Sequence, residues 1–174
     1  MVRARRTVMR KPAPVLKVGL QCAIDKPGLP TLAHIKLWAR AALLKDAEVT
    51  FRIVGRREGR ILNRQFRGKE HATNVLTFAY TDHEPFLGDI VLCAPVIAKE
   101  ASEQHKTLQA HYAHLVVHGM LHLQGHDHET AKDAKIMEAL ETQIIMQLGY
   151  ADPYAPCQMN KPGTGGPGPF TKTE

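Results

Sequence analysis

Histidines crowd one short stretch of the chain, from His118 to His128, and their spacing limits how that stretch can fold. His118 and His122 stand four residues apart, so on a helix their imidazoles project from the same face, one turn above the other. Two imidazoles placed in this way can reach one metal ion at roughly 2.0–2.1 Å each. The stretch is therefore predicted to be a helix that carries two ligands of a single metal site.

Gly125 follows the second histidine and offers a way to add a third ligand. Because glycine readily adopts a left-handed turn, it can end the helix and let the chain fold back with His128. Three neutral nitrogen ligands leave a fourth position open, as in catalytic zinc sites, where a bound water has its pKa lowered to about 7. We therefore predict one zinc ion per chain, held by His118, His122 and His128. Nickel and copper also accept three nitrogens, and a histidine-rich surface that binds metal adventitiously is the alternative.

The spacing H-x3-H-x2-G-x2-H is also the one that metzincin proteases use. In proteases with the HExxH motif, the glutamate directly after the first histidine acts as the general base. Gly119 occupies that position in this chain. Peptidase activity is therefore disfavoured, and the general base stays unassigned.

Four polar residues close to the predicted ligands each have more than one interpretation. His111 and His114 share the helix face of His118, where each either supports a ligand, lines a substrate groove or is a partly exposed polar side chain. His126 is expected to point elsewhere, because a fourth histidine ligand would close the open position. Asp127 either orients a ligand imidazole or caps the helix that follows.

Strand and helix patterns alternate along the chain. Strand patterns cover residues 15–23, 48–54, 74–80 and 89–94, and helical patterns cover 31–43, 58–66, 95–104, 107–125 and 130–148. In the last helix the apolar residues that recur every four positions are expected to bury one face: Ile136, Leu140, Ile144 and Leu148. The first strand–helix–strand unit predicts a parallel pair, and the short connection from Tyr80 to Asp89 predicts an antiparallel hairpin. We expect an α+β fold with one mixed four-stranded sheet, flanked by about five helices, and the zinc site at the end of a central helix.

Composition divides the chain into three parts. Residues 1–14 are rich in Arg and Lys and are predicted to form a mobile arm. Residues 15–150 are predicted to form the catalytic domain. Residues 151–174 are rich in Pro and Gly and cannot bury enough apolar surface to become ordered, so a flexible tail is expected there.

Cysteine use and hydropathy indicate a protein that stays in the cytoplasm. Cys22, Cys93 and Cys157 are far apart and form no CxxC pair, which is typical of thiols in a reducing compartment. No run approaches the roughly eighteen apolar residues of a membrane-spanning helix. Lys17 interrupts the short apolar run after the basic arm, which disfavours a signal peptide. The net charge of +6, with a pI near 9.3, favours polyanionic partners.

Three segments carry a family resemblance: LNRQFRGKEHATNVLTF (62–78), LGDIVLC (87–93) and HLVVHGMLHLQGHDHE (114–129). In this order they resemble the YbeY family of bacterial ribosomal-RNA maturation endoribonucleases, and the last is similar to the family signature HGxLHLxGYDH. With the final helix ending in LG, the likeness spans roughly residues 15 to 150. One departure is visible, since His126 stands where the family often has tyrosine; the three ligand positions are intact.

The resemblance implies both an activity and a set of partners. The family's zinc ligands fall on His118, His122 and His128, and its functional arginine falls on Arg67. The implied activity is cleavage of single-stranded RNA, in maturation of the small-subunit (16S) ribosomal RNA near its 3′ end and in late ribosome quality control. The implied partners are ribosomal RNA, the small ribosomal subunit, a small-subunit ribosomal protein and a ribosome-associated GTPase.

The chemistry of Arg67 agrees with this role. Its planar guanidinium matches the geometry of a phosphate that gathers negative charge, and it lies just before Gly68 in an expected loop. The alternative is a solvated surface arginine. Lys69 either adds charge to the site or is an ordinary surface lysine. For three other nearby polar residues we favour structural roles over substrate contacts: Thr73, Asn74 and Asp89.

Two chemical routes and two other functions remain open at this stage. Either a zinc-bound water attacks the phosphate, or it activates the ribose 2′-hydroxyl to attack, with Arg67 stabilising the charge in both routes. A ribosome-assembly factor that binds RNA and keeps a chiefly structural zinc is a different class of function, and the missing carboxylate base keeps it open. A metal-dependent hydrolase of another substrate is the third possibility.

Overall fold

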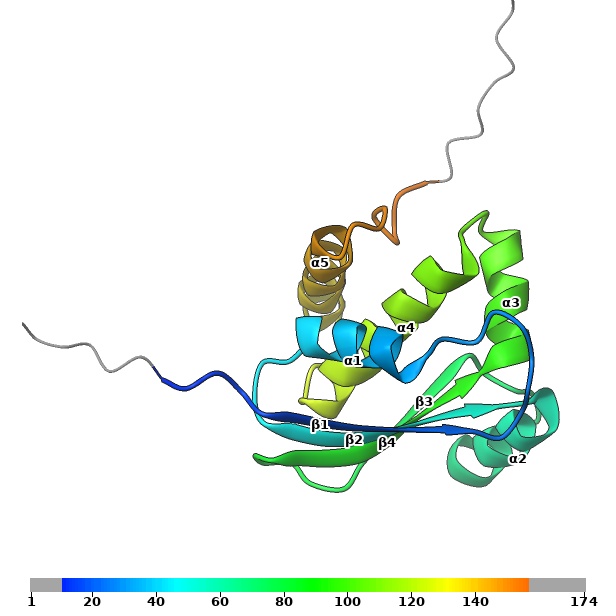
Figure 1. Ribbon diagram of the computed structural model, residues 1–174, viewed down its shortest axis with the longest axis horizontal. Helices are drawn as coiled ribbons and strands as arrows, with labels where there is room; N and C mark the ends of the chain where they lie inside the picture. Colours follow the sequence, from blue (N-terminus) through cyan, green and yellow to red (C-terminus); the bar gives the residue numbers. More distant parts are fainter. Residues whose placement is uncertain (1–10, 157–174) are drawn as a thin grey trace, which may run out of the picture.

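A four-stranded sheet organises the part of the chain that the computed structural model describes, residues 11–156 (Figure 1). The strands are β1 (Leu16–Cys22), β2 (Ala47–Val54), β3 (Val75–Ala79) and β4 (Phe86–Cys93); the helices are α1 (Leu32–Ala41), α2 (Arg56–Arg67), α3 (Ala94–Glu103), α4 (Leu108–Leu123) and α5 (Ala131–Gln147). This set confirms the predicted α+β fold. Most of the predicted arm, the tail from residue 157 onward and Cys157 lie outside the described residues.

The sheet is mixed, with the strand order β1-β2-β4-β3. β1 pairs in parallel with β2, and β2 pairs in parallel with β4. β3 runs antiparallel to β4 at the edge of the sheet, with Thr77 opposite Ile90. The predicted parallel pair and the predicted hairpin are both confirmed. Along β2 the alternating residues Val49, Phe51 and Ile53 are buried on the inner face, as the period of two in a half-buried strand requires.

α4 is the central helix of the fold. It contacts β3, β4, α1, α3 and α5, and Figure 1 shows it on one side of the sheet with α1, while α2 lies toward the other side. Its apolar side chains are buried around most of its circumference, among them Tyr112, Val116, Met120 and Leu121. A helix that is apolar on nearly all sides is one that packs inside a protein. Neither α4 nor any other helix within residues 11–156 is long and apolar enough to cross a membrane.

Threonine side chains start three of the helices. Thr31, Thr107 and Thr130 precede α1, α4 and α5, and each side chain accepts a backbone N–H from the first turn of its helix. Such N-caps satisfy donors that have no partner inside the helix. Asp127 is not the cap of α5; its carboxylate instead accepts the backbone N–H of His128 at 2.7 Å.

α5 buries a different stripe from the one that its apolar spacing predicts. Ile136 is 47% exposed, and the buried residues of the helix are Met137, Glu141, Ile144 and Ile145. A strict repeat of four drifts around a helix of 3.6 residues per turn. A position two repeats before Ile144 has therefore turned toward solvent. The prediction for Ile136 was wrong, and the buried glutamate in this stripe belongs to the site described below.

The two described cysteines do not pair. Cys22 is exposed at the end of β1 and Cys93 is buried at the end of β4, and both are free thiols. Burial raises the pKa of the Cys93 thiol. A buried thiol with a raised pKa is a poor nucleophile and behaves as a small apolar side chain.

Candidate metal centre

The end of α4 determines where the third histidine lies. The helix stops at Leu123, and Gly125 takes a left-handed conformation with φ of 90°. The N–H of Gly125 donates to the carbonyl of His122, and the N–H of His126 donates to the carbonyl of Leu121, each at 3.0 Å. This pair of bonds is a Schellman motif, which closes a helix and reverses the chain. The reversal returns residues 126–130 toward the last two turns of α4.

Three imidazoles meet as a result of this turn. The candidate ligand atoms of His118, His122 and His128 all lie within 4.8 Å of one another. Their ring centroids are 4.6 Å apart for His118 and His122, 4.8 Å for His122 and His128, and 5.8 Å for His118 and His128. His126 is outside this group. The three side chains are therefore placed to hold one metal ion.

The protonation of His122 also suits a metal ligand. Burial of His122, together with the nearby imidazoles of His118 and His128, lowers the pKa of His122 to about 4. The neutral imidazole is the form that binds metal, because a protonated nitrogen has no lone pair to donate. At neutral pH His122 is therefore already in the neutral form that binds metal, and no proton has to be displaced from it when the ion binds.

A buried carboxylate orients the first ligand. Glu141 of α5 has no exposed surface, and one of its oxygens accepts a hydrogen bond from Nδ1 of His118. With Nδ1 donating, the tautomer is fixed and Nε2 of His118 is left free to bind a metal. Burial by itself raises the pKa of Glu141, but hydrogen bonds from His114, His118 and Tyr154 outweigh it and lower that pKa to about 2. Glu141 is thus a buried anion beside the cluster.

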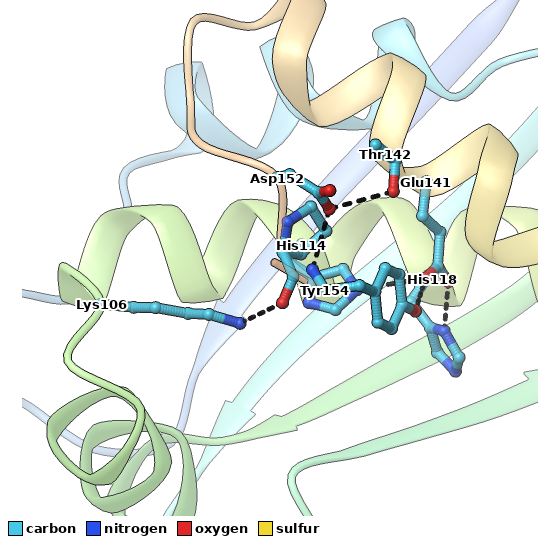
Figure 2. A network of polar contacts seen from close by, with 8 residues as sticks. Lys106, His114, His118, Glu141, Thr142, Asp152 and Tyr154 are labelled. Carbon is cyan, nitrogen blue, oxygen red and sulfur yellow. Dashed lines mark hydrogen bonds and ion pairs between the residues drawn. The ribbon is translucent and has the colours of Figure 1, made fainter. Parts of the chain in front are cut away.

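The second oxygen of Glu141 has two donors of its own, which Figure 2 shows together. Nε2 of His114 donates to it at 3.1 Å, and the Tyr154 hydroxyl donates to the same oxygen. His114, whose side chain is 13% exposed, therefore supports a ligand indirectly through Glu141. Tyr154 belongs to residues 151–156, beyond the predicted domain boundary at residue 150, and these residues lie against the rest of the described chain. Neither Glu141 nor Tyr154 carried a signal in the sequence, since a glutamate in an amphipathic helix and a tyrosine in a Pro-rich segment are ordinary there.

A cavity of about 230 Å³ opens beside the three histidines. Arg67, at the end of α2, lines this cavity with the cluster, together with Thr73 and Asn74. The remaining wall is the edge strand β3, which contributes Val75, Thr77 and Ala79. Arg67 and the histidines, 51 residues or more apart in sequence, thus share one cavity.

Two of the nearby candidates lie away from this cavity. Asp89 is on the outer face of the sheet, where its carboxylate accepts the Tyr80 hydroxyl at 2.5 Å and lines a separate cavity of about 470 Å³. Lys69 lines neither cavity. The structural role favoured for Asp89 therefore agrees with its position, which is across the sheet from the histidines.

A second buried chain of contacts supports the cavity wall at Asn74. The Asn74 amide donates to both carboxylate oxygens of Glu100, at 3.2 and 3.0 Å. Nε2 of His111 contacts Glu100 at 2.8 Å, and His111 is only 3% exposed. Burial lowers the pKa of His111, against the opposing effect of its hydrogen bond to Glu100. His111 therefore supports the wall of the cavity through Glu100, and it also lines a neighbouring cavity of about 360 Å³ together with Glu100 and His114.

A family model described as Endoribonuclease YbeY matches residues 31–149 of the chain. The chain belongs to the YbeY family. The matched region contains Arg67 and all three clustered histidines, so the described cavity lies within the part that the family shares. The predicted resemblance is confirmed.

Relatives in the YbeY family are similar over most of their length. An Endoribonuclease YbeY from Nitrosomonas eutropha is 60% identical over 135 residues, which covers 78% of this chain and 96% of the relative. One from Aromatoleum aromaticum is 61% identical over 126 residues, covering 72% and 82%. The solution structure of TM1509 from Thermotoga maritima is 26% identical with a TM-score of 0.55, and covers 81% of this chain and 99% of that one. That likeness supports the same α+β fold.

Proposed function

We propose that this chain is a zinc-dependent endoribonuclease that cuts single-stranded RNA and matures the 3′ end of small-subunit ribosomal RNA. Membership of a family of endoribonucleases makes it an RNA-cleaving hydrolase. The observation that carries the proposal is the shared cavity of about 230 Å³, which Arg67 lines together with His118, His122 and His128. A metal site and a cation in one cavity are suited to binding a phosphodiester.

The donor set of the cluster fits zinc. All three donors are imidazole nitrogens, His118 is held as a fixed tautomer by Glu141, and the pKa of His122 is about 4. Imidazole is a preferred zinc ligand, and three protein ligands leave a position open. When bound by these three residues, zinc supplies Lewis acidity toward a phosphoryl oxygen and an activated water.

Arg67 is proposed to bind the phosphate at the cleaved bond. Within residues 11–156 no carboxylate pairs with its guanidinium, whereas its neighbours Arg60 and Arg64 on α2 both contact Glu70, at 3.5 and 3.1 Å. An unpaired guanidinium at the cavity wall keeps its donors free for two phosphate oxygens. Negative charge that develops on those oxygens during cleavage is stabilised by a cation already in place.

The wider setting of the activity is also proposed. Substrate and partners would be ribosomal RNA within the small subunit, a small-subunit ribosomal protein and a ribosome-associated GTPase, in the cytoplasm and with a part in ribosome quality control. The net charge of +6 supports a polyanionic substrate, because Lys and Arg displace counterions from phosphates.

A second candidate function is an RNA-binding assembly factor with a chiefly structural zinc. The observation in its favour is the lining of the cavity, in which no Asp or Glu takes part among the described residues. A carboxylate that accepts a proton from the attacking group is a usual component of hydrolytic zinc sites. The two candidates differ in whether Arg67 affects a chemical step or only binding.

Cleavage of a labelled single-stranded RNA by zinc-loaded wild type, Arg67→Ala and Arg64→Ala tests the proposal. Arg67→Ala should lower kcat about 10²- to 10³-fold, as removal of a charge-stabilising donor does, while zinc content and RNA binding are retained. Arg64→Ala removes an exposed arginine of the same helix and should cleave nearly as fast as wild type. A cyclic phosphate product would identify the 2′-hydroxyl as the attacking group.

Two outcomes would contradict the proposal. Equal cleavage by wild type and Arg67→Ala would remove Arg67 from the chemistry. Tight RNA binding by a zinc-loaded wild type that cleaves neither free RNA nor small-subunit particles would instead support the assembly factor.

A further inference from the structure

Residues 151–156, which we call the C-terminal strap, are held to the rest of the chain at several points. The Lys106 ammonium donates to the carbonyl of Pro153 at 2.6 Å, and Pro153 is buried. The Thr142 hydroxyl on α5 donates to Asp152 at 3.2 Å, and the same carboxylate oxygen accepts the N–H of Tyr154 at 2.9 Å. These contacts, drawn in Figure 2, fix the backbone immediately before Tyr154 and aim its side chain at Glu141.

The position of Tyr154 is better explained by its hydroxyl than by packing. The residue remains 45% exposed, so its ring contributes little buried apolar area, yet its O–H reaches a carboxylate that has no exposed surface. The ring lies edge-on against His114, with centroids 5.3 Å apart and planes at 83°. Tyr154 and His114 thus approach the same oxygen of Glu141 side by side, while His118 takes the other oxygen.

We propose that Tyr154 is a positioning residue for the metal centre, and that the docked C-terminal strap thereby sets the metal affinity of the three histidines. A buried carboxylate keeps its place only when donors satisfy its oxygens. The Tyr154 hydroxyl donates a hydrogen bond to the Glu141 oxygen that does not contact His118, and this bond restricts the movement of the carboxylate. Glu141 is thereby held in the orientation in which its other oxygen accepts from Nδ1 of His118. Residues that hydrogen bond to a metal-binding histidine tune the metal affinity in this way, and their mutation commonly lowers that affinity 10- to 100-fold. The inference rests on the proposed function only in that the histidines hold a metal.

Zinc affinity of the purified full chain, measured by competition with a chromophoric chelator, gives a readout that needs no RNA. Tyr154→Phe removes only the hydroxyl and should weaken zinc binding about tenfold, the lower end of the range for such partners. Glu141→Gln should weaken it by more. Tyr150→Phe is the matched control, because Tyr150 packs on the core near the same chain end, and it should bind zinc as wild type does. The absorption spectrum of the cobalt-substituted protein should change in Tyr154→Phe and not in Tyr150→Phe.

A double-mutant cycle separates positioning from general stability. If the hydroxyl acts through Glu141, then Tyr154→Phe should cause no further loss of zinc affinity in the Glu141→Gln background, so the two effects are not additive. A Tyr154→Phe affinity within twofold of wild type, or fully additive losses, would overturn the proposal. A wild type that binds no metal would overturn the metal site itself, and would do so before any variant is compared. A wild type that binds zinc but cleaves no RNA would contradict the proposed function alone and would leave the role of Tyr154 to be decided by the zinc affinities.

Discussion

Gly119 of α4 lies directly against Ile90 of β4, so close that an added Cβ would stand 3.0 Å from Cγ2 and 3.1 Å from Cδ1 of Ile90. The helix that carries the first two histidines therefore rests on the sheet at this residue. In the HExxH proteases, the corresponding position holds the glutamate base. Here the position faces the sheet, where a Cβ would crowd Ile90.

Substitution of Gly119 by alanine should destabilise the protein by about 1–3 kcal/mol, the usual cost of overpacking. Urea denaturation of the metal-free protein measures this loss. Ile90→Ala removes both clashing atoms, so Gly119→Ala should cost clearly less in that background than in wild type. Equal costs in the two backgrounds would show that Ile90 is not what restricts Gly119.

Gly125 and Gly68 provide a matched pair of left-handed glycines, with φ of 90° and 66° and open space where a Cβ would stand. Alanine at either position should cost about 1 kcal/mol in stability, because a side chain disfavours this conformation. Only Gly125→Ala should also weaken metal binding, since Gly125 forms the turn that returns His128. Urea denaturation and zinc competition measure the two effects, and equal zinc affinities for both variants would contradict this account of the turn.

The buried His111 should make the metal-free protein less stable in mild acid. Its pKa is lowered from 6.5, first by burial and also by the charges of His114 and Lys106, while Glu100 opposes the shift. Below about pH 6.5 the unfolded chain therefore binds a proton at this residue that the folded chain does not, and stability falls as pH falls. Denaturation of the chelator-treated protein between pH 7 and 5 should show a shallower decline for His111→Gln than for wild type. An equal or steeper decline would assign the acid sensitivity to other groups.

The parts of the site that the sequence predicts are those that depend on local geometry. Helical spacing places His118 and His122 on one face, and the turn at Gly125 is a property of that residue and its neighbours. Arg67 was assigned through family resemblance, and the structure brings it to the histidines only because α2 and β3 border the same cavity.

The parts that the sequence does not predict depend on contacts between distant elements. Glu141 is a buried anion only because α4 and the C-terminal strap both direct donors at it, and its own helix gives no sign of this. Tyr154 lies in a segment whose composition indicates a tail, and the hydrogen bonds that hold the segment come from residues up to 47 positions away.

Two unlike sets of side chains line the cavity beside the histidines. Arg67 and the imidazoles supply its cation and its metal-binding groups, while the edge strand β3 contributes the uncharged side chains of Val75, Thr77 and Ala79. The side chains of β3 add no charge to the cavity, so its electric field comes from Arg67 and from any ion that the imidazoles hold.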